Sequence, residues 1–365
     1  MKFVLKGVAA VSLWLAGCAV ESEAVDDDAL VSMSGGLSSC VAPALRELID
    51  ANGFKPSCEP SAAATVDGKV WIASDKQLPS TATTRTAFMQ YSPSAILSND
   101  QPPTGYLHSK GVLEGASKIE AMAYDAQSKT VFAITAFDNA TAAAQNQLLA
   151  IPTADPSQAY VVGVVGDERL AIGDAPDTVG IRSRISSALG APYFKIEGIA
   201  VIDGTLYLGV RESGADKANK RYRRTVLKAA LLQQVDRSFQ VSPVVELAFE
   251  ISGADDVGIS DLLFDPAKGL VYILGSTEDA IASPSSLGGR LWTMSKADFV
   301  GGKASGAKLH AAQFRHKTEG LTLFPDGRLL VIADDDRVES GFATEPGIFT
   351  GTRRKDQFAY YLLRP

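Results

Sequence analysis

A short pattern recurs along this chain: an acidic residue, an apolar run, a tight turn and a second apolar run. Its clearest copy is residues 195–212, KIEGIAVIDGTLYLGVRE, in which Ile199–Ile202 and Leu206–Val210 flank Asp203-Gly204. Asp-Gly between two apolar runs is typical of a β-hairpin with a two-residue turn. The acidic residues of the five copies are Glu59, Glu120, Glu197, Asp261 and Glu319. A unit that repeats in this way predicts an array of similar β-hairpins.

The spacing of the copies indicates the architecture. Successive acids lie 61, 77, 64 and 58 residues apart, as their residue numbers give directly. A unit near 60 residues is too long for a leucine-rich or ankyrin repeat and suits a four-stranded propeller blade with generous loops. Further short apolar runs, separated by Gly, Pro, Asp or Ser, follow each hairpin. We therefore predict an all-β fold, a β-propeller of five blades, with six as the alternative because residues 166–194 are irregular.

The connections argue against an α/β fold. That fold would need amphipathic helices of ten or more residues between strands, and the Pro/Gly-rich connections leave few places for them. Residues 42–51 are the best helix candidate. The last unit lacks an evident fourth strand before Pro365, and a closed propeller often completes its last blade from the other terminus. We expect residues 41–56 to supply that strand.

The N-terminus has the pattern of a targeting segment. A basic start is followed by a short apolar run and by Leu15-Ala16-Gly17-Cys18. The run is too short to span a bilayer as a mature helix. The segment resembles a bacterial lipoprotein signal, which implies cleavage before Cys18 and lipidation of its thiol; an ordinary secretory signal is the alternative. We expect residues 1–17 to be a signal peptide, 18–39 a flexible acidic linker and 40–365 the propeller domain.

Two cysteines follow Cys18. In an exported chain, Cys40 and Cys58 read as a disulfide, with two buried free thiols as the alternative. The three histidines are scattered and give no zinc spacing with them. The net charge of −7 and the isoelectric point near 5.2 show no basic stripe, which argues against nucleic acid as a partner.

Antiparallel pairing places the start of each first strand and the end of its second strand at the same edge of the blade. The five acids, Glu59, Glu120, Glu197, Asp261 and Glu319, should therefore converge on one face around the axis. Carboxylates so close repel one another unless their pKa values rise, cations lie nearby or a metal binds. Oxygen ligands without Cys or His suit Ca²⁺ or Mg²⁺, and we expect Ca²⁺.

Three roles for the acids stay open. They can accept backbone N–H groups of the neighbouring blade, a subset can bind an ion, or one can act in catalysis, for which Glu197 is the best candidate. Basic residues near the same edge are candidates for charge compensation or for binding an anionic ligand; they are Lys118, Lys195, Arg211, Arg224 and Lys317. The sequence shows no nucleophile elbow, P-loop or dinucleotide fingerprint.

Two short sequence patterns in the chain resemble those of known protein families. Glu-Gly, an apolar strand, Asp-Gly and Leu-Tyr-Leu-Gly resemble the bacterial propeller family named for an "esterase-like activity of phytase", over roughly residues 55–365. This resemblance implies an ester or phosphoester hydrolase. Lys118-Ile119-Glu120 and Lys195-Ile196-Glu197 are similar to a phrase of the calcium-activated apyrases, which implies an axial Ca²⁺ and nucleotide hydrolysis.

Two functions are therefore expected from the sequence. The first is an envelope-anchored, calcium-binding propeller that hydrolyses a small ester or phosphoester. The second is a non-catalytic propeller that binds a glycan, a peptide or another envelope protein. In either case the lipid on Cys18 would hold the protein at a bacterial envelope membrane, most simply the outer membrane. Propellers support both functions, so the site has to decide between them.

Overall fold

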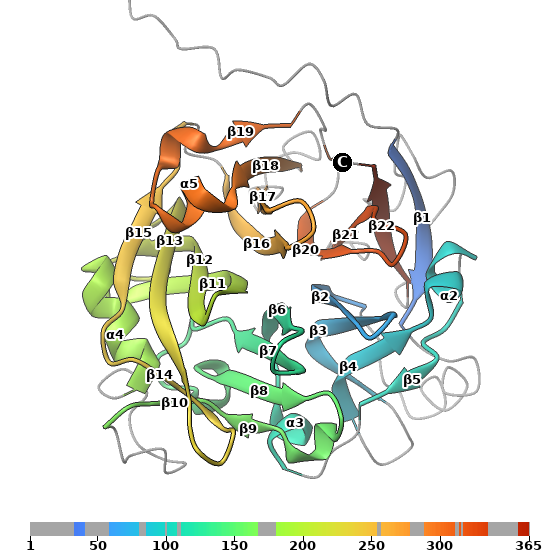
Figure 1. Ribbon diagram of the computed structural model, residues 1–365, viewed down its shortest axis with the longest axis horizontal. Coiled ribbons are helices and arrows are strands. Elements are labelled where there is room, and N and C mark those ends of the chain that lie inside the picture. Colours follow the sequence, from blue (N-terminus) through green and yellow to red (C-terminus); the bar gives the residue numbers. More distant parts are fainter. Residues whose placement is uncertain are drawn as a thin grey trace, which may run out of the picture.

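The chain folds into a five-bladed β-propeller, which confirms the predicted fold class (Figure 1). The computed structural model describes residues 33–40, 58–79, 85–98, 101–107, 111–166, 180–253, 257–277, 288–310, 314, 317–334 and 357–364. Among these residues, no helix is long and apolar enough to cross a membrane. In Figure 1 the innermost strands β2, β6, β11, β16 and β20 surround a common centre.

In blades 1, 2 and 4 the strands are antiparallel and follow one another outward from the axis in chain order. Blade 1 contains β2 (Pro60–Val66), β3 (Lys69–Pro79), β4 (Arg85–Tyr91) and β5 (Gly105–Tyr106). Blade 2 contains β6 (Ile119–Asp125), β7 (Thr130–Thr135), β8 (Leu148–Pro152) and β9 (Tyr160–Val161). Blade 4 contains β16 (Gly258–Asp265), β17 (Leu270–Ser276), β18 (Gly289–Ser295) and β19 (Lys308–Leu309).

Blade 3 is wider than the others. It contains β11 (Tyr193–Ile202), β12 (Thr205–Gly214), β13 (Lys220–Gln233), β14 (Phe239–Val241) and β15 (Glu246–Glu250), and β10 (Gly163–Val164) pairs in parallel with β14. The turn between β11 and β12 has positive φ at both Asp203 (50°) and Gly204 (71°). Positive φ at both central residues is the conformation that Asp-Gly favours in hairpins.

Helices are few and short. They are α2 (Pro93–Leu97), α3 (Val112–Gly115), α4 (Gly180–Leu189) and α5 (Lys296–Val300), with 3₁₀ turns η2 (Ala143–Gln145), η3 (Pro156–Gln158) and η5 (Ala304–Gly306). In the irregular segment 166–194 the described residues form α4 and the start of β11, and they include no strand of a sixth blade. The predicted helix 42–51 lies outside the described residues.

The hydrophobic core is divided among the blade interfaces. Both faces of most inner strands are buried, because a blade packs against a neighbour on each side. For example, Ile196 of β11 packs with Phe132 of blade 2, whereas Tyr207 of β12 packs with Trp292 of blade 4. Each fully buried side chain of this size contributes about 1.5–3 kcal/mol of transfer free energy.

The closing strand of the propeller differs from the prediction. Blade 5 contains β20 (Thr318–Leu323), β21 (Leu329–Ala333) and β22 (Gln357–Leu363), and its outer strand is β1 (Met33–Ser39). The pairing runs from Met33 opposite Leu363 to Ser39 opposite Gln357. The prediction placed this strand at 41–56, and it assigned 33–39 to the linker because the sequence MSGGLSS has little β-propensity. Backbone pairing with the edge of β22 holds residues 33–39 as a strand although their own β-propensity is low.

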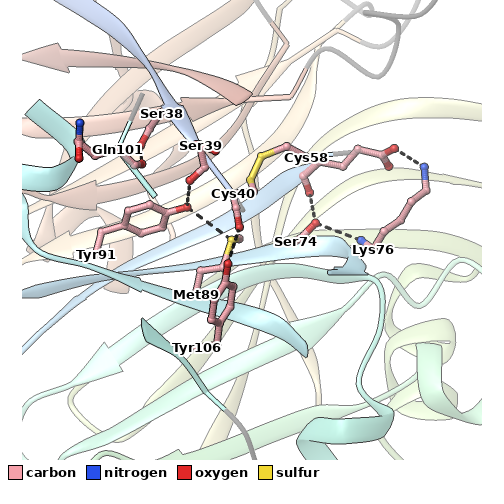
Figure 2. The surroundings of a disulfide bond; sticks show 11 residues. Ser38, Ser39, Cys40, Cys58, Ser74, Lys76, Met89, Tyr91, Gln101 and Tyr106 are labelled. Atoms are coloured by element: carbon pink, nitrogen blue, oxygen red, sulfur yellow. Dashed lines mark hydrogen bonds and ion pairs between the residues drawn. A yellow bond between two sulfur atoms is a disulfide. The ribbon is translucent and has the colours of Figure 1, made fainter. Parts of the chain in front are cut away.

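A disulfide adjoins this closure, as predicted (Figure 2). Cys40 directly follows β1 of blade 5, and Cys58 lies just before β2 of blade 1. Tyr91 Oη donates a hydrogen bond to the Ser39 carbonyl (2.8 Å), and Tyr106 Oη donates one to the Cys40 carbonyl (3.2 Å). Covalent and hydrogen bonds therefore join the last blade to the first.

Candidate functional site

The innermost strand of every blade has a β-bulge near its start. At each bulge one residue has no partner on the second strand; these residues are Ser61, Glu120, Glu197, Ser260 and Glu319. A bulge re-aims the side chain of the extra residue. The five positions are structurally equivalent, and they define what we call the bulge ring.

The bulge ring corrects the alignment expected from the sequence. Glu120, Glu197 and Glu319 occupy equivalent positions, but Asp261 is one residue beyond the bulge of its strand, and Glu59 is two residues before the bulge of β2. The equivalent residues in those two blades are Ser260 and Ser61. Carboxylates therefore occupy three positions of the ring and hydroxyls the other two.

The three glutamates meet on the propeller axis. One carboxylate oxygen of each lies within 4.8 Å of those of the other two. The side chains of Glu120, Glu197 and Glu319 are 4%, 0% and 3% exposed. Such a buried group of carboxylates could hold a metal ion.

Basic side chains alternate with these glutamates. Lys195 Nζ forms an ion pair with Glu197 and lies 3.5 Å from Glu120 Oε1. Arg211 Nη1 pairs with the other oxygen of Glu197 and lies 3.2 Å from Glu319 Oε2. Lys317 Nζ lies 2.7 Å from Glu319 Oε1. A chain of ion pairs thus runs around the axis through blades 2, 3 and 5.

Blade 4 has no lysine of this kind. The position two residues before the bulge is occupied by Lys118, Lys195 and Lys317 in blades 2, 3 and 5, respectively. In blade 4 the same position is occupied by Gly258. A Cβ atom built on Gly258 would lie 2.7 Å from Cγ of Arg211. The missing side chain leaves the space in which Arg211 reaches across from β12, so the arginine compensates for the absent lysine.

Three aspartates extend the group toward solvent. Lys118 Nζ lies 3.8 Å from Asp75 Oδ1 and 3.5 Å from Asp138 Oδ2, and Lys317 Nζ lies 4.0 Å from Asp334 Oδ2. The resulting axial cluster comprises Asp75, Lys118, Glu120, Asp138, Lys195, Glu197, Arg211, Lys317, Glu319 and Asp334. Six ionised carboxylates and four cations leave these ten side chains with a charge of −2.

The axial cluster is open at one side and closed at the other. The Lys118 side chain is 31% exposed and that of Asp75 is 21% exposed, whereas Arg211 and Glu197 are fully buried. Lys118 lies at the start of blade 2, and Asp75 ends the second strand of blade 1. A small ion or ligand would therefore reach the glutamates from the side of blades 1 and 2.

Burial perturbs the protonation of two glutamates. Burial raises the pKa of Glu120 well above its ordinary value, although Lys195 opposes the shift. Burial also raises the pKa of Glu319, against the opposing charges of Lys317 and Arg211. Glu120 Oε1 is buried and accepts no hydrogen bond from the described residues. Glu197 Oε1 likewise accepts no hydrogen bond from these residues, but it forms an ion pair with Lys195, whereas Glu120 Oε1 lies 3.5 Å from Lys195 Nζ.

The other two predicted ligands point to different partners. Asp261 is fully buried, and its two oxygens accept hydrogen bonds from Leu262 N (2.8 Å) and from Leu321 N of blade 5 (2.7 Å). Burial raises the pKa of Asp261 although these hydrogen bonds oppose the shift. Glu59 pairs with Lys76. Asp261 therefore has the architectural role that was one of the three alternatives.

Of the predicted binding residues, Lys118, Lys195, Arg211 and Lys317 belong to the axial cluster. Arg224 is also buried, on β13, the third strand from the axis. Sequence reasoning missed Ser61 and Ser260, because a β-bulge leaves no mark in a short apolar strand. A separate cavity of about 650 Å³ opens at the opposite end of the axis, lined by hairpin residues such as Tyr124, Val201 and Phe264.

The fold and site together define a class: a five-bladed β-propeller with a buried cluster of carboxylates and cations on its axis. No family model matches the chain, and no curated protein matches it. Among solved structures, a protein of unknown function from Bacteroides thetaiotaomicron is 8% identical, with a TM-score of 0.39, over 91% of this chain and 76% of that chain.

Two enzymes also resemble it distantly. A sucrose-6-phosphate hydrolase from Lactobacillus gasseri is 9% identical, with a TM-score of 0.42, over 83% of this chain and 57% of its own. A family GH43 β-1,3-galactosidase, solved with galactodeoxynojirimycin, is 10% identical, with a TM-score of 0.40, over 85% of this chain and 90% of its own. These similarities are too distant to assign a substrate or a reaction.

Proposed function

We propose that this protein binds a divalent cation, Ca²⁺, at the axial cluster. The observation that carries the proposal is the meeting of three buried glutamates, whose oxygens lie within 4.8 Å of one another. All three ligands offer oxygen, which is the donor that Ca²⁺ and Mg²⁺ prefer. Among the described residues, no Cys or His completes this group, and that absence favours a hard cation over zinc.

The charge of the axial cluster supports the same proposal. Its ten side chains carry −2 when all are ionised, so one divalent cation would balance them. Without the cation, protonation of Glu120 would reduce the repulsion between the carboxylates, in agreement with the raised pKa of that carboxyl. Glu120, Glu197 and Glu319 would hold the ion, and Asp75 and Asp138 flank its entry.

Lys195 competes with the cation. Its ammonium lies between Glu120 and Glu197, where it occupies oxygens that the ion would need. Cation binding therefore requires Lys195 to turn toward the more exposed side of the cluster. Removal of the Lys195 ammonium therefore distinguishes two roles of the cluster. It should strengthen cation binding if the cluster is a binding site, and it should only weaken the fold if the cluster is a purely structural chain of ion pairs.

The test is calorimetric titration and thermal melting of residues 19–365 with EDTA and then Ca²⁺. We expect Ca²⁺ to raise the melting temperature, and Lys195→Met to bind Ca²⁺ at least about tenfold more tightly because the ligand set is then more negative. The control is Lys296→Met, which removes a surface ion pair with Asp203 on the opposite face. Absence of any Ca²⁺ effect in both wild type and Lys195→Met would overturn the proposal.

Hydrolysis of a small ester or phosphoester is the second candidate. Glu120 favours it, since a carboxyl whose pKa burial raises, near the more exposed side of the cluster, is suited to act as a general acid. Glu197, the candidate from the sequence, is fully buried and pairs with a cation at each oxygen, so it is less accessible to a substrate. When bound, the cation would polarise a phosphoryl or carbonyl oxygen.

This candidate is tested with nitrophenyl acetate and nitrophenyl phosphate in the presence of Ca²⁺. Turnover that falls at least about a hundredfold in Glu120→Gln, but little in Glu114→Gln, would support hydrolysis. Glu114 is the matched control because it is exposed and lies on α3 outside the cluster. Ca²⁺ binding without turnover would favour the non-catalytic alternative, a propeller that presents its axial face to a glycan, a peptide or another envelope protein.

We also propose that the propeller is held at a bacterial envelope membrane by lipid on Cys18. The support is the phrase Leu15-Ala16-Gly17-Cys18 after a short apolar run. We expect metabolic labelling with a fatty acid to mark the wild-type chain and not Cys18→Ala, with the wild type alone in the membrane fraction. Equal labelling of the two chains would exclude the anchor.

A further inference from the structure

Ser260 occupies the blade 4 position of the bulge ring. The pairing of β16 with β17 runs from Ile259 opposite Gly275 directly to Asp261 opposite Leu274, so Ser260 is the unpaired residue. The equivalent shift in pairing leaves Glu197 unpaired in blade 3 and Glu319 unpaired in blade 5. Because the pairing step is shared, Ser260 occupies the same position on its strand as the two glutamates do on theirs.

Within the part of the chain that the structure describes, the hydroxyl of Ser260 has no hydrogen-bond partner. Ser260 is fully buried, and its Oγ neither donates nor accepts a hydrogen bond among the described residues. The corresponding serine of blade 1 differs, because Ser61 Oγ donates to the Ile119 carbonyl of blade 2. A buried hydroxyl without a partner is destabilising, so an orphan of this kind calls for a ligand or an ordered water.

The surroundings of Ser260 favour a cation over an anion as that ligand. Its two neighbours in the bulge ring are Glu197 and Glu319, and both are already linked by Arg211. A neutral hydroxyl oxygen is an acceptor that adds a ligand without adding charge. Ca²⁺ takes six to eight oxygen ligands, which is more than three glutamates supply when each binds through one oxygen.

We propose that Ser260 Oγ is a fourth protein ligand of the axial cation. This inference rests on the function proposed above. It gives blade 4, whose bulge-ring residue is uncharged, a ligand of its own. Four of the five ring positions then serve the ion. Ser61 is excluded because its hydroxyl is committed to the neighbouring blade.

The test compares Ser260→Ala and Ser260→Asp by calorimetric titration with Ca²⁺. We expect Ser260→Ala to weaken binding about tenfold, the equivalent of one lost contact to a charged group, and Ser260→Asp to strengthen it by a similar factor. In EDTA, Ser260→Ala should melt at the wild-type temperature or above, because it removes an unsatisfied hydroxyl, and Ser260→Asp should melt lower.

The matched control is Ser276→Ala. Ser276 is also fully buried on blade 4, and its hydroxyl also has no hydrogen-bond partner in the described part of the chain, but it lies on β17 opposite Gly258 and outside the bulge ring. We expect its Ca²⁺ affinity to equal that of the wild type. If wild type binds Ca²⁺ while both Ser260 variants keep its affinity, the inference fails and the proposed function stands. If wild type does not bind Ca²⁺, both fail.

Discussion

Buried carboxylates around the axis fall into two kinds according to their partners. Asp261 accepts backbone N–H groups from its own strand and from blade 5, so its charge is spread over fixed dipoles. Glu120, Glu197 and Glu319 face ammonium and guanidinium groups instead. Side-chain partners can move aside and backbone partners cannot. The glutamates are therefore the residues that a ligand can recruit, and Asp261 is not.

Asp261→Asn tests the architectural role. An amide has a single carbonyl oxygen, so one of the two N–H groups would face an NH₂ group. We expect the free energy of unfolding in urea to fall by about 1–3 kcal/mol. The control, Asp216→Asn, alters an exposed aspartate that accepts hydrogen bonds within its own loop, and it should change little. Equal stability of the two variants would contradict the assignment.

The pH dependence of stability follows from the raised pKa values. Burial raises the folded-state pKa of Glu120, Glu319 and Asp261, so above the ordinary carboxyl pKa the folded state retains protons that the unfolded state has released. Stability must then fall as pH rises through this window. We expect urea unfolding in EDTA to show stability declining as the pH rises above the ordinary carboxyl pKa, and this decline should be shallower in Glu120→Gln. Glu114→Gln should follow the wild-type curve; a wild-type stability that rises over this range would refute the shifts.

At the scale of elements, the β-bulge converts a strand into part of the site. The inner strands are buried on both faces around the bulge, which re-aims one side chain of each strand. Glycines make room beside it. Gly258 leaves the space for Arg211, and Cβ atoms built on Gly320 and Gly198 would lie within 3.0 Å of side chains of Ile332 and Leu262.

Gly258→Ala tests this packing. The methyl group would collide with the backbone oxygen of Arg211 and with its Cγ, so both the backbone and the side chain of Arg211 would have to shift. We expect a loss of about 1–3 kcal/mol in the free energy of unfolding, together with a weaker link between Glu197 and Glu319. Gly115→Ala is the control, because its Cβ would have no heavy atom within 4 Å. A Gly258→Ala protein as stable as Gly115→Ala would show that Arg211 tolerates displacement.

At the scale of the whole molecule, stability depends on joining blade 5 to blade 1. Strand β1 covers the edge of β22 over seven residue pairs, and the disulfide links Cys40 to Cys58 across an 18-residue separation. An uncovered β22 would present an apolar edge, since its residues are buried and include Phe358 and Tyr360. Ring closure is thus a property of both chain ends together.

Matched truncations test the closure. Chain 33–365 retains β1, and chain 40–365 lacks it while keeping both cysteines. We expect the first to melt like 19–365, and the second to melt at a lower temperature and to self-associate in size-exclusion chromatography through the exposed edge. Comparable melting of the two chains would mean that β1 contributes nothing to the fold.

The disulfide gives a separate prediction. The double variant Cys40→Ala, Cys58→Ala should lose about 3 kcal/mol, as the loop-entropy model gives for a loop of this length. Urea unfolding of the oxidised wild type, the reduced wild type and the variant measures it. The reduced wild type should match the variant, and a reduced protein as stable as the oxidised one would contradict the estimate.

The sequence by itself determined the repeat, the five blades, the disulfide and the convergence of Glu120, Glu197 and Glu319, because hairpins and antiparallel pairing are local rules. Only the tertiary structure decided the rest. Whether Asp261 or Ser260 faces the axis depends on a one-residue shift in register, which moves a side chain to the other face of a strand. Likewise, residues 33–39 become a strand only because β22 offers an unpaired edge at the opposite end of the chain. Register and edge pairing are set by contacts between distant segments, and no local pattern records them.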